Sequence, residues 1–599
     1  MTLADIALGT AGLLTLIAPG ALLAHRWRLP QPLLAGFIGS VVVLFAFLLG
    51  LQLAGQPLTT EVIRPIWGGF TIAAIVRWWF GRVQTRAPFG ETRFPWASHW
   101  PLLLPLVPAF AVVIYRAHAQ PLHGVDTIFR WNYLAEQMLA RGSLGFYPPV
   151  TTADFEIYAW PDGIAPVVST LYFWIYSVAG EARPGLTAPL VSFQFALVVV
   201  AVFALARQLF SPRAAVFAAA LVACTPLVGW ASAMGQETGL TAIALVALLL
   251  YLPKNRADET HSTVLVAAMA AALGALAREY GLVIPLFGFG LCVARRLSPR
   301  ACTIFAVVVA VSVVPWYARN WALTGNPLFG LGVGGWFPTN EVHAWLNASY
   351  QAEHGWAHLP SEAPRLILTN GLAALIGGLA GVALFFRKAP ALVAGVALFV
   401  ALWAVSLGYT AAGFIYSLRV LNPALALAAV LGGAALAHWV PARRLLGAIT
   451  IALTLFAVDA ALRTLTLPAN VYRIPPGEWL AAGRALHDYH ERPIYRELAR
   501  IAGQERILVL GPNALLNTRG ARTVPLWSPE VRFLFDATLA PAEIARRLRA
   551  AGIGYALLTT GKVNERFLAH SAFLRDPAGA LQPVWSDPDM VLLRVTTPP

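Results

Sequence analysis

The sequence predicts an all-α polytopic membrane protein of about fourteen spans with juxtamembrane helices, followed by a C-terminal soluble α/β domain. Of its 599 residues, 58% are hydrophobic and only 12% are charged, whereas about a quarter of the residues in soluble domains are charged. Apolar runs of about 17 to 25 residues recur along the chain, which is the length that a hydrocarbon core about 30 Å thick requires. After Pro468 these runs stop, and short helix and strand patterns replace them.

Fourteen segments have the length and composition of membrane spans. The first has no basic residue before it and contains Asp5, so we expect a span rather than a cleaved signal peptide. A further apolar run, 164–180, is predicted to be a surface or re-entrant helix, because counting it as a span would move the next basic loop across the membrane. The predicted spans are 3–24, 33–53, 63–80, 99–118, 186–206, 214–233, 238–252, 262–277, 281–296, 302–317, 366–386, 391–408, 420–439 and 444–463.

Short basic loops give the predicted orientation, since Lys and Arg accumulate in the cytoplasmic loops of membrane proteins. All of them fall on one side if the N-terminus is outside and fourteen spans follow. The opposite side then receives loops 119–185 and 318–365 and the tail. These loops and anionic lipid account for the formal net charge of +14, so we expect no nucleic-acid partner. The basic loops lie at 25–28, 82–93, 207–213, 254–256, 295–300, 387–388 and 443–444.

The tail, residues 468–599, has the pattern of a small α/β domain. Helices are predicted at 478–501 and 541–551, the second with Pro541 at its start and Gly552 after its end. The tail has neither a phosphate-binding glycine-rich loop nor a nucleophile elbow, so no chemistry is assigned to it. Strands are predicted at 506–510, 523–527, 555–559 and 590–595.

Asp126 is the first candidate for chemistry. It follows a predicted span by a few residues, so it lies against the bilayer, and His123, Arg130 and Trp131 add polar and aromatic groups around it. The alternative interpretation is an ordinary helix N-cap, because Asp before an apolar run often caps a helix.

Glu237 is the second candidate, in a short turn between two predicted spans. It either faces water or converges with Asp126, since the topology places both on one side. Two carboxylates at the membrane surface suit a reaction in which a hydroxyl is deprotonated beside a departing phosphate. The remaining loop carboxylates, Asp154, Glu156 and Asp162, are supporting candidates for acceptor binding.

Arg278 lies with Glu279 and Tyr280 at the tip of a predicted helical hairpin. Arg278 and Glu279 form either a simple ion pair at helix ends or a site where the guanidinium binds phosphate in a bidentate manner. Arg319 and Arg419 occupy comparable positions at the ends of spans.

No metal site is predicted. His343, His354 and His358 share one loop, but no acidic or thiolate partner has metal-site spacing nearby. The three cysteines lie inside or beside apolar runs, which argues against a disulfide framework or a thiolate site.

Residues 315–329 read PWYARNWALTGNPLF, which resembles the PWYxRNWxxTGNP signature of bacterial C-type (GT-C) membrane glycosyltransferases, relatives of the protein O-mannosyltransferases and the lipid A aminoarabinose transferase. The similarity runs from about 119 to 470. The spans before it suggest an extra N-terminal transmembrane module, 1–98, ahead of a GT-C-like catalytic domain, 99–467. Shorter pieces that resemble the family in the same order are 124–126, 161–180, 207–213, 235–237 and 419–424.

The resemblance implies an inverting glycosyltransferase of a bacterial inner (plasma) membrane whose active site and C-terminal domain are extracytoplasmic. It implies a polyprenyl-phosphate-linked sugar donor and a glycan, lipid or protein acceptor. No cofactor is required, and a divalent-metal site would lack one ligand, because Thr127 stands where family members often carry a second acidic residue.

The resemblance also implies roles for residues of this chain. Asp126 would be the general base, and Glu237 would orient the acceptor or balance charge. Arg278, Arg319 and Arg419 would bind the donor phosphate. The residues expected to contact substrate are His123, Arg130, Trp131, Glu279 and Tyr280.

Two functions of other classes remain open from the sequence. A transporter or flippase for a lipid-linked sugar would use the same cavity and arginines without a base. A scaffold would use its external α/β domain to recruit partners. Formation of a covalent product distinguishes the enzyme from both.

Overall fold

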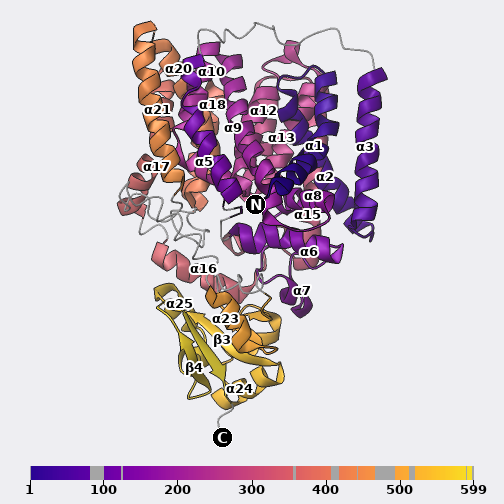
Figure 1. Ribbon diagram of the computed structural model, residues 1–599, viewed down its shortest axis with the longest axis vertical. Coiled ribbons are helices and arrows are strands. Elements are labelled where there is room, and N and C mark those ends of the chain that lie inside the picture. The colour runs from indigo at the N-terminus through magenta and orange to yellow at the C-terminus, as the bar shows by residue number, and fades with distance from the viewer. Residues whose placement is uncertain are drawn as a thin grey trace.

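A computed structural model describes residues 2–80, 100–119, 121–122, 126–354, 359–406, 417–440, 443–465, 493–510, 520–588 and 590–596. Long helices run side by side in one part of the molecule, and a small sheet domain lies at one end of them (Figure 1). The coarse part of the predicted class, many apolar helices followed by a small C-terminal α/β domain, is confirmed.

The helical part consists of long apolar helices and shorter polar ones. Its principal helices are α1 (Leu3–Arg26), α2 (Pro32–Leu53), α3 (Thr60–Phe80), α5 (Leu106–Ala119), α6 (Tyr133–Arg141), α7 (Thr152–Ile157), α8 (Val167–Ala179), α9 (Ala188–Leu209), α10 (Pro212–Ala223), α11 (Pro226–Ala233), α12 (Glu237–Tyr251), α13 (His261–Ala277), α14 (Val283–Ala294), α15 (Pro299–Thr324), α16 (Glu341–His354), α17 (Leu359–Phe385), α18 (Pro390–Ser406), α20 (Asn422–Trp439) and α21 (Arg443–Leu465).

Within the described residues, seven helices are long and apolar enough to cross a membrane, and a bent pair would make an eighth. Several other predicted spans are helices of 10–17 residues, and a 15-residue helix is only about 22 Å long. The predicted number of fourteen is therefore not confirmed. The seven are Leu3–Arg26, Pro32–Leu53, Pro101–Ala119, Pro184–Leu209, Pro299–Thr324, Leu418–Trp439 and Leu445–Thr464.

Two predicted segments differ from expectation. The single span 214–233 is broken into α10 and α11, which meet at 68°, because Pro226 has no N–H to continue the first helix and begins a new one. Segment 164–180 is helical, as α8, but its residues are buried by α1, α2 and α6. It is an interior helix of the protein rather than one on its outside, and the re-entrant alternative stays a prediction.

The C-terminal domain has a five-stranded sheet in the order β2-β1-β3-β5-β4. β1 pairs in parallel with β2 and β3, and β5 runs antiparallel to β3 and β4. Four strands and the helix at 541 were predicted, and β4 was not. The elements are α23 (Pro493–Ala502), β1 (Arg506–Val509), β2 (Thr523–Pro525), α24 (Pro541–Ala550), β3 (Ile553–Thr559), α25 (Lys562–Leu568), α26 (Ala572–Arg575), β4 (Leu581–Ser586) and β5 (Met590–Val595).

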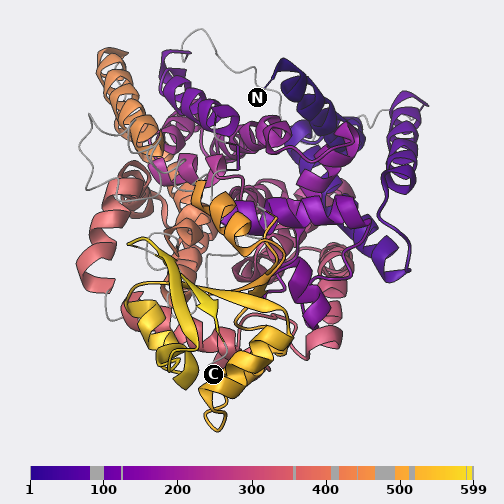
Figure 2. The same cartoon turned by 60° about the horizontal axis from the view of Figure 1, so that its bottom comes forward.

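The sheet domain contacts α16 and the loop that carries α6 and α7 (Figures 1 and 2). One buried apolar cluster joins Phe155 of the loop and Leu346 of α16 to sheet residues such as Leu508. A second joins Phe129 and Ala159 of the loop to the sheet and α23. The loop is therefore enclosed between the helices and the domain.

Candidate functional site

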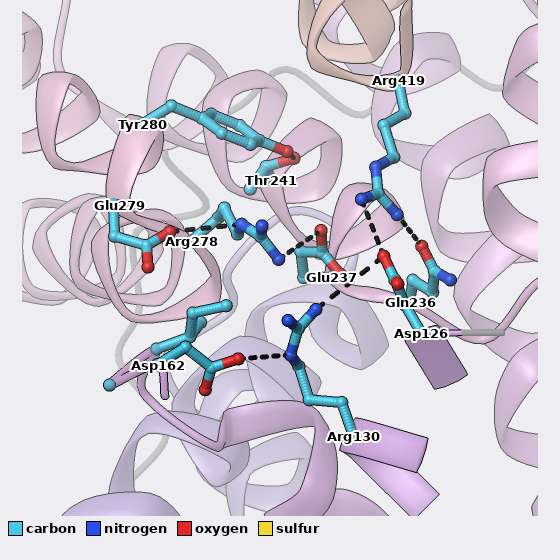
Figure 3. Close-up of polar contacts among 12 residues, drawn as sticks. Asp126, Arg130, Asp162, Gln236, Glu237, Thr241, Arg278, Glu279, Tyr280 and Arg419 are labelled. Carbon is cyan, nitrogen blue, oxygen red and sulfur yellow. Dashed lines mark hydrogen bonds and ion pairs between the residues drawn. The ribbon is translucent and has the colours of Figure 1, made fainter. Parts of the chain in front are cut away.

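Asp126 lies just before a turn of π-helix, Thr127–Asn132, that leads into α6. Its carboxylate makes no capping hydrogen bond to that turn, so the N-cap interpretation is wrong. Instead, Oδ2 accepts a hydrogen bond from Nη2 of Arg419 at 2.9 Å and lies 3.8 Å from Nη1 of Arg130. Arg419 belongs to the short helix 418–421 that precedes α20, so Asp126 contacts a segment far away in the chain (Figure 3).

Arg130 connects Asp126 to a second buried carboxylate. Its Nε donates to Oδ2 of Asp162 at 2.7 Å, and the Tyr147 hydroxyl donates to Oδ1 of Asp162 at 2.7 Å. Asp162 is 6% exposed. Asp162 is therefore paired with Arg130 inside the protein, and its part in acceptor binding stays a prediction.

The sequence motif 315–329 holds the loop next to Asp162. The side chains of Trp316 and Asn320 both donate to the Gly163 carbonyl, at 3.0 Å and 2.7 Å. The Gly163 N–H donates to the carbonyl of Phe329 at 3.0 Å. A Cβ on Gly163 would lie 2.8 Å from Nδ2 of Asn320, so a larger residue here would have to displace one of the groups that hold the loop. The most specific motif in the sequence is thus a clamp on the loop.

Arg319 belongs to this clamp rather than to the group of carboxylates. Its Nη1 donates to the Tyr147 carbonyl at 2.7 Å and its Nη2 to the Leu144 carbonyl at 3.3 Å. The guanidinium also lies over the Trp316 ring, 5.3 Å from its centroid. The sequence motif could not show which of these roles Arg319 has, because arginine is suited both to binding phosphate and to donating hydrogen bonds to loop carbonyls.

Glu237 and Arg278 form a second charged group. Nη1 of Arg278 lies 3.3 Å from Oε1 of Glu237, and its Nε lies 3.1 Å from Oε2 of Glu279. Glu237 opens α12 and is 1% exposed, so the interpretation that it faces water is wrong. Its Oε2 has no hydrogen-bond partner among the residues that the structure describes.

Gln236, which precedes Glu237 in the chain, contacts the first group and was missed from the sequence. Its Oε1 accepts from Nη1 of Arg419, and its Nε2 donates to the Thr127 hydroxyl at 3.0 Å. The Thr127 hydroxyl in turn donates to the Met234 carbonyl at 2.9 Å. The sequence feature that could have identified Gln236 is its position next to Glu237 in the predicted turn.

Three guanidiniums and four carboxylates therefore share one site (Figure 3). Its members differ in access. The side chains of Asp126 and Arg278 are 25% and 21% exposed, whereas those of Arg130 and Arg419 are 6% and 9% exposed. One carboxylate and one guanidinium are thus the most open to an incoming molecule, and the other charges surround them.

Electrostatics keep Asp126 ionised. Burial raises the pKa of its carboxyl, but the guanidiniums of Arg419 and Arg130 outweigh this and hold the pKa below its ordinary value. For Glu279, burial dominates over the guanidinium of Arg278, and the pKa is raised. The two carboxyls are therefore tuned in opposite directions.

The remaining predicted residues lie around this site or outside it. His123 is outside the described residues. Trp131 is fully buried in the helical core, and the Tyr280 hydroxyl lies 3.4 Å from that of Thr241. Asp154 accepts from Thr151 in a capping box, and Glu156 lies 3.3 Å from Nη2 of Arg506. Neither of these two loop carboxylates joins the charged site.

No three His, Cys, Asp or Glu side chains in the described part of the chain come together as metal ligands. Of the predicted histidine group, His343 packs edge-on against Trp160 and Trp527, and the side chain of His354 and all of His358 lie outside the described residues. The carboxylates of the site face guanidiniums, which is not the donor set of a divalent-cation site.

The family model for dolichyl-phosphate-mannose-protein mannosyltransferase matches residues 166–318 of this chain. The matched segment runs from α8 into α15 and contains Glu237, Arg278 and Glu279, while Asp126 and Arg419 lie outside it. This match confirms the resemblance to membrane glycosyltransferases related to the protein mannosyltransferases that the sequence motifs indicated.

A comparison with solved structures finds two that are similar to this chain at low identity. ArnT from Cupriavidus metallidurans bound to undecaprenyl phosphate is 14% identical, with a TM-score of 0.46 over 83% of this chain and 98% of that one. The archaeal oligosaccharyltransferase AglB from Archaeoglobus fulgidus, in complex with an inhibitory peptide and a dolichol-phosphate, is 13% identical, with a TM-score of 0.46 over 78% and 70%. No curated protein sequence matches the chain significantly.

Proposed function

We propose that this protein is an inverting glycosyltransferase that moves a sugar from a polyprenyl-phosphate carrier to an acceptor outside the cytoplasm. The observation that carries the proposal is that two opposite charges are partly exposed in an otherwise buried site. Asp126 is ionised and accessible, and the guanidinium of Arg278, which faces Glu237 and Glu279, is accessible in the same site. The match to a mannosyltransferase family whose name includes a lipid-phosphate sugar supports the donor class.

Asp126 is the general base of the proposed reaction. The acceptor hydroxyl attacks the anomeric carbon while Asp126 takes its proton, and the bond from that carbon to the phosphate oxygen breaks with its electron pair leaving on the phosphate. A carboxylate of low pKa is ionised at neutral pH. It can take the proton because the acceptor hydroxyl becomes more acidic as its oxygen forms the bond to the anomeric carbon. Attack from the face opposite the phosphate inverts the anomeric centre.

The arginines stabilise the departing phosphate. Its negative charge grows as the sugar leaves, so fixed cations bind the transition state more strongly than the donor. Arg278 is the more accessible of these arginines, and Arg419 lies in the same site, where it is bound to Asp126. Arg319 is left out of this role, because its donors are used by loop carbonyls.

Glu237 orients a substrate hydroxyl. Its Oε1 faces Arg278, while its buried Oε2 lacks a donor among the described residues. A buried carboxylate oxygen without a donor is costly unless a ligand supplies one, and the hydroxyls of a sugar are suitable donors.

Asp126→Asn tests the proposal. The amide cannot accept the proton, so transfer from a polyprenyl-phosphate sugar is expected to fall by about 10²- to 10⁴-fold. The measurement is covalent product formed by the purified protein. Asp154→Asn is the matched control, because this carboxylate lies on the same loop and only caps α7, and it should retain activity.

A near-normal rate in Asp126→Asn would overturn the assignment. Movement of the lipid-linked sugar across a bilayer without covalent product would favour the transporter or flippase. Recruitment of partners that survives without residues 470–599 would count against the scaffold.

A further inference from the structure

Among the contacts between the C-terminal sheet domain and the loop 119–185 is an aromatic cluster of Phe129, Trp160, His343 and Trp527. Trp527 follows β2 and donates its indole N–H to the Ala159 carbonyl at 2.6 Å. Its ring packs edge-on against Trp160 and His343, with centroids 5.0 Å and 5.4 Å apart. The domain thus contacts the loop directly, three residues before Asp162.

The same cluster also contacts Arg130, the partner of Asp162 in the buried ion pair. Trp160 packs on Phe129, with ring centroids 5.5 Å apart, and Phe129 precedes Arg130 in the chain. The Arg130 guanidinium lies 5.2 Å from the centroid of the Phe129 ring. Arg130 and Asp162, which together hold the surroundings of Asp126, are therefore both next to residues that the sheet domain supports.

Residues 158–165 have no helix or strand of their own, so contacts decide where this segment lies. The clamp of Trp316 and Asn320 holds it at Gly163. Trp527 holds it at Ala159. Asp162 lies between these two points.

Trp527 is itself fixed. Its side chain is 3% exposed, and its carbonyl accepts from Nδ2 of Asn340, just before α16, at 2.9 Å. Ion pairs from Arg506 to Glu156 and from Arg566 to Glu353, at 3.3 Å and 2.9 Å, hold the domain against the loop and α16. Because tightly packed side chains do not deform freely, a Trp527 held from several sides keeps the loop segment that it contacts in place.

We propose that Trp527 is a positioning residue for the glycosyl transfer, through which the C-terminal domain holds Arg130 and Asp162 in the geometry that Asp126 requires. The inference rests on the proposed function and deepens it: the domain without chemistry of its own is a required part of the catalytic unit. Misplacement of supporting groups by about 1 Å costs about 10²-fold in rate.

Trp527→Ala, Trp527→Phe and Trp345→Ala test the inference in the full-length protein. Trp345 is the matched control, because it stacks on His570 at 4.7 Å and packs on Phe535, both in the sheet domain. It therefore belongs to the same interface without forming part of the aromatic cluster. Trp527→Phe keeps a ring in the cluster and loses only the N–H.

The expected result is a fall in kcat of about tenfold or more for Trp527→Ala with little change in the donor KM, and a smaller fall for Trp527→Phe. Trp345→Ala should keep kcat within about threefold of the unmodified protein, because the contacts of Trp527 with the loop remain in this variant. An equal fall in kcat for Trp345→Ala and Trp527→Ala would overturn the inference and assign the effect to general loss of docking.

Amide hydrogen exchange over 127–132 and 158–165 gives a readout that needs no activity. Trp527→Ala should raise exchange in both segments, and Trp345→Ala should leave them protected. Unchanged exchange in Trp527→Ala would also overturn the inference. If the unmodified protein forms no glycosyl product, the proposed function fails, while the exchange experiment still decides whether the domain holds the loop.

Discussion

Arg419 and Arg130 determine the charge state of Asp126 against the effect of burial. Burial favours the protonated carboxyl, and the two guanidiniums favour the ionised one. Because the net shift is downward, the acidic limb of the pH–rate profile that belongs to this group lies below the range of an ordinary aspartate. The rate should therefore be insensitive to Asp126 titration at neutral pH and decrease only as pH falls through the lowered pKa.

Replacing Arg419 with Gln should move that acidic limb to higher pH. The substitution removes the largest effect that lowers the pKa of Asp126, so the opposing effect of burial is offset less and the pKa rises. Arg419→Lys keeps a positive charge and should move the limb less. The measurement is kcat/KM against pH for both variants. An acidic limb that stays in place in Arg419→Gln would contradict the assignment of the base to Asp126.

Asp162→Asn should destabilise the site without removing a catalytic group. Arg130 would be left buried with a weaker partner, and breaking a buried ion pair costs about 3–5 kcal/mol. We expect a lower midpoint of thermal unfolding and weaker transfer together. The exposed pair of Arg547 and Glu543, whose arginine is 47% exposed, provides the control: Glu543→Gln should have almost no effect on either measurement.

At the scale of elements, the clamp of the 315–329 motif on the loop can be tested at Gly163. A Cβ there would lie 2.8 Å from Asn320 Nδ2 and 3.0 Å from Cβ of Phe329, so Gly163→Ala must displace either the Asn320 side chain, which breaks its bond to the Gly163 carbonyl, or the loop. We expect transfer to fall by about 10²-fold. Gly332→Ala is the control within the following loop, because its nearest contact would be 3.4 Å. Equal activity of the two variants would mean that the clamp does not position Asp162.

Elements were predictable from the sequence where pattern and local chemistry agree. Apolar runs gave the helices, and buried runs before turn residues gave strands such as β1 and β3. β4 was missed because it contains Pro583 and is mostly exposed, so neither alternation nor apolar content marks it. The break at Pro226 lies inside an apolar run, where composition alone indicates one continuous span.

The site was predictable only in part, because ion pairing depends on tertiary contacts. Asp126, Glu237, Arg278 and Arg419 could be selected as charges at the ends of spans. That Asp162 anchors Arg130, and that Arg319 holds carbonyls, depends on segments more than 30 residues apart in the chain. Sequence spacing carries no information on which of several arginines meets which carboxylate.

At the scale of the whole molecule, the helical part and the sheet domain meet around His343, whose protonation state should affect their docking. Burial first and the charge of Arg130 second lower the pKa of His343 from 6.5 to about 3. The imidazole is therefore neutral when folded, and its stabilising contribution is present above the unfolded-state pKa. That contribution is lost as pH falls from 6.5 toward 3, by about 1.4 kcal/mol for each pH unit.

His343→Phe should remove this pH dependence while preserving the aromatic cluster with Trp160 and Trp527. Between pH 7 and pH 5 the unmodified protein should lose about 2 kcal/mol of stability through this group, seen as a lower midpoint of thermal unfolding. The variant should show a smaller difference between the two pH values. An equal difference in both proteins would mean that the pKa of His343 is the same in the folded and unfolded states, and that burial at the interface does not hold the imidazole neutral.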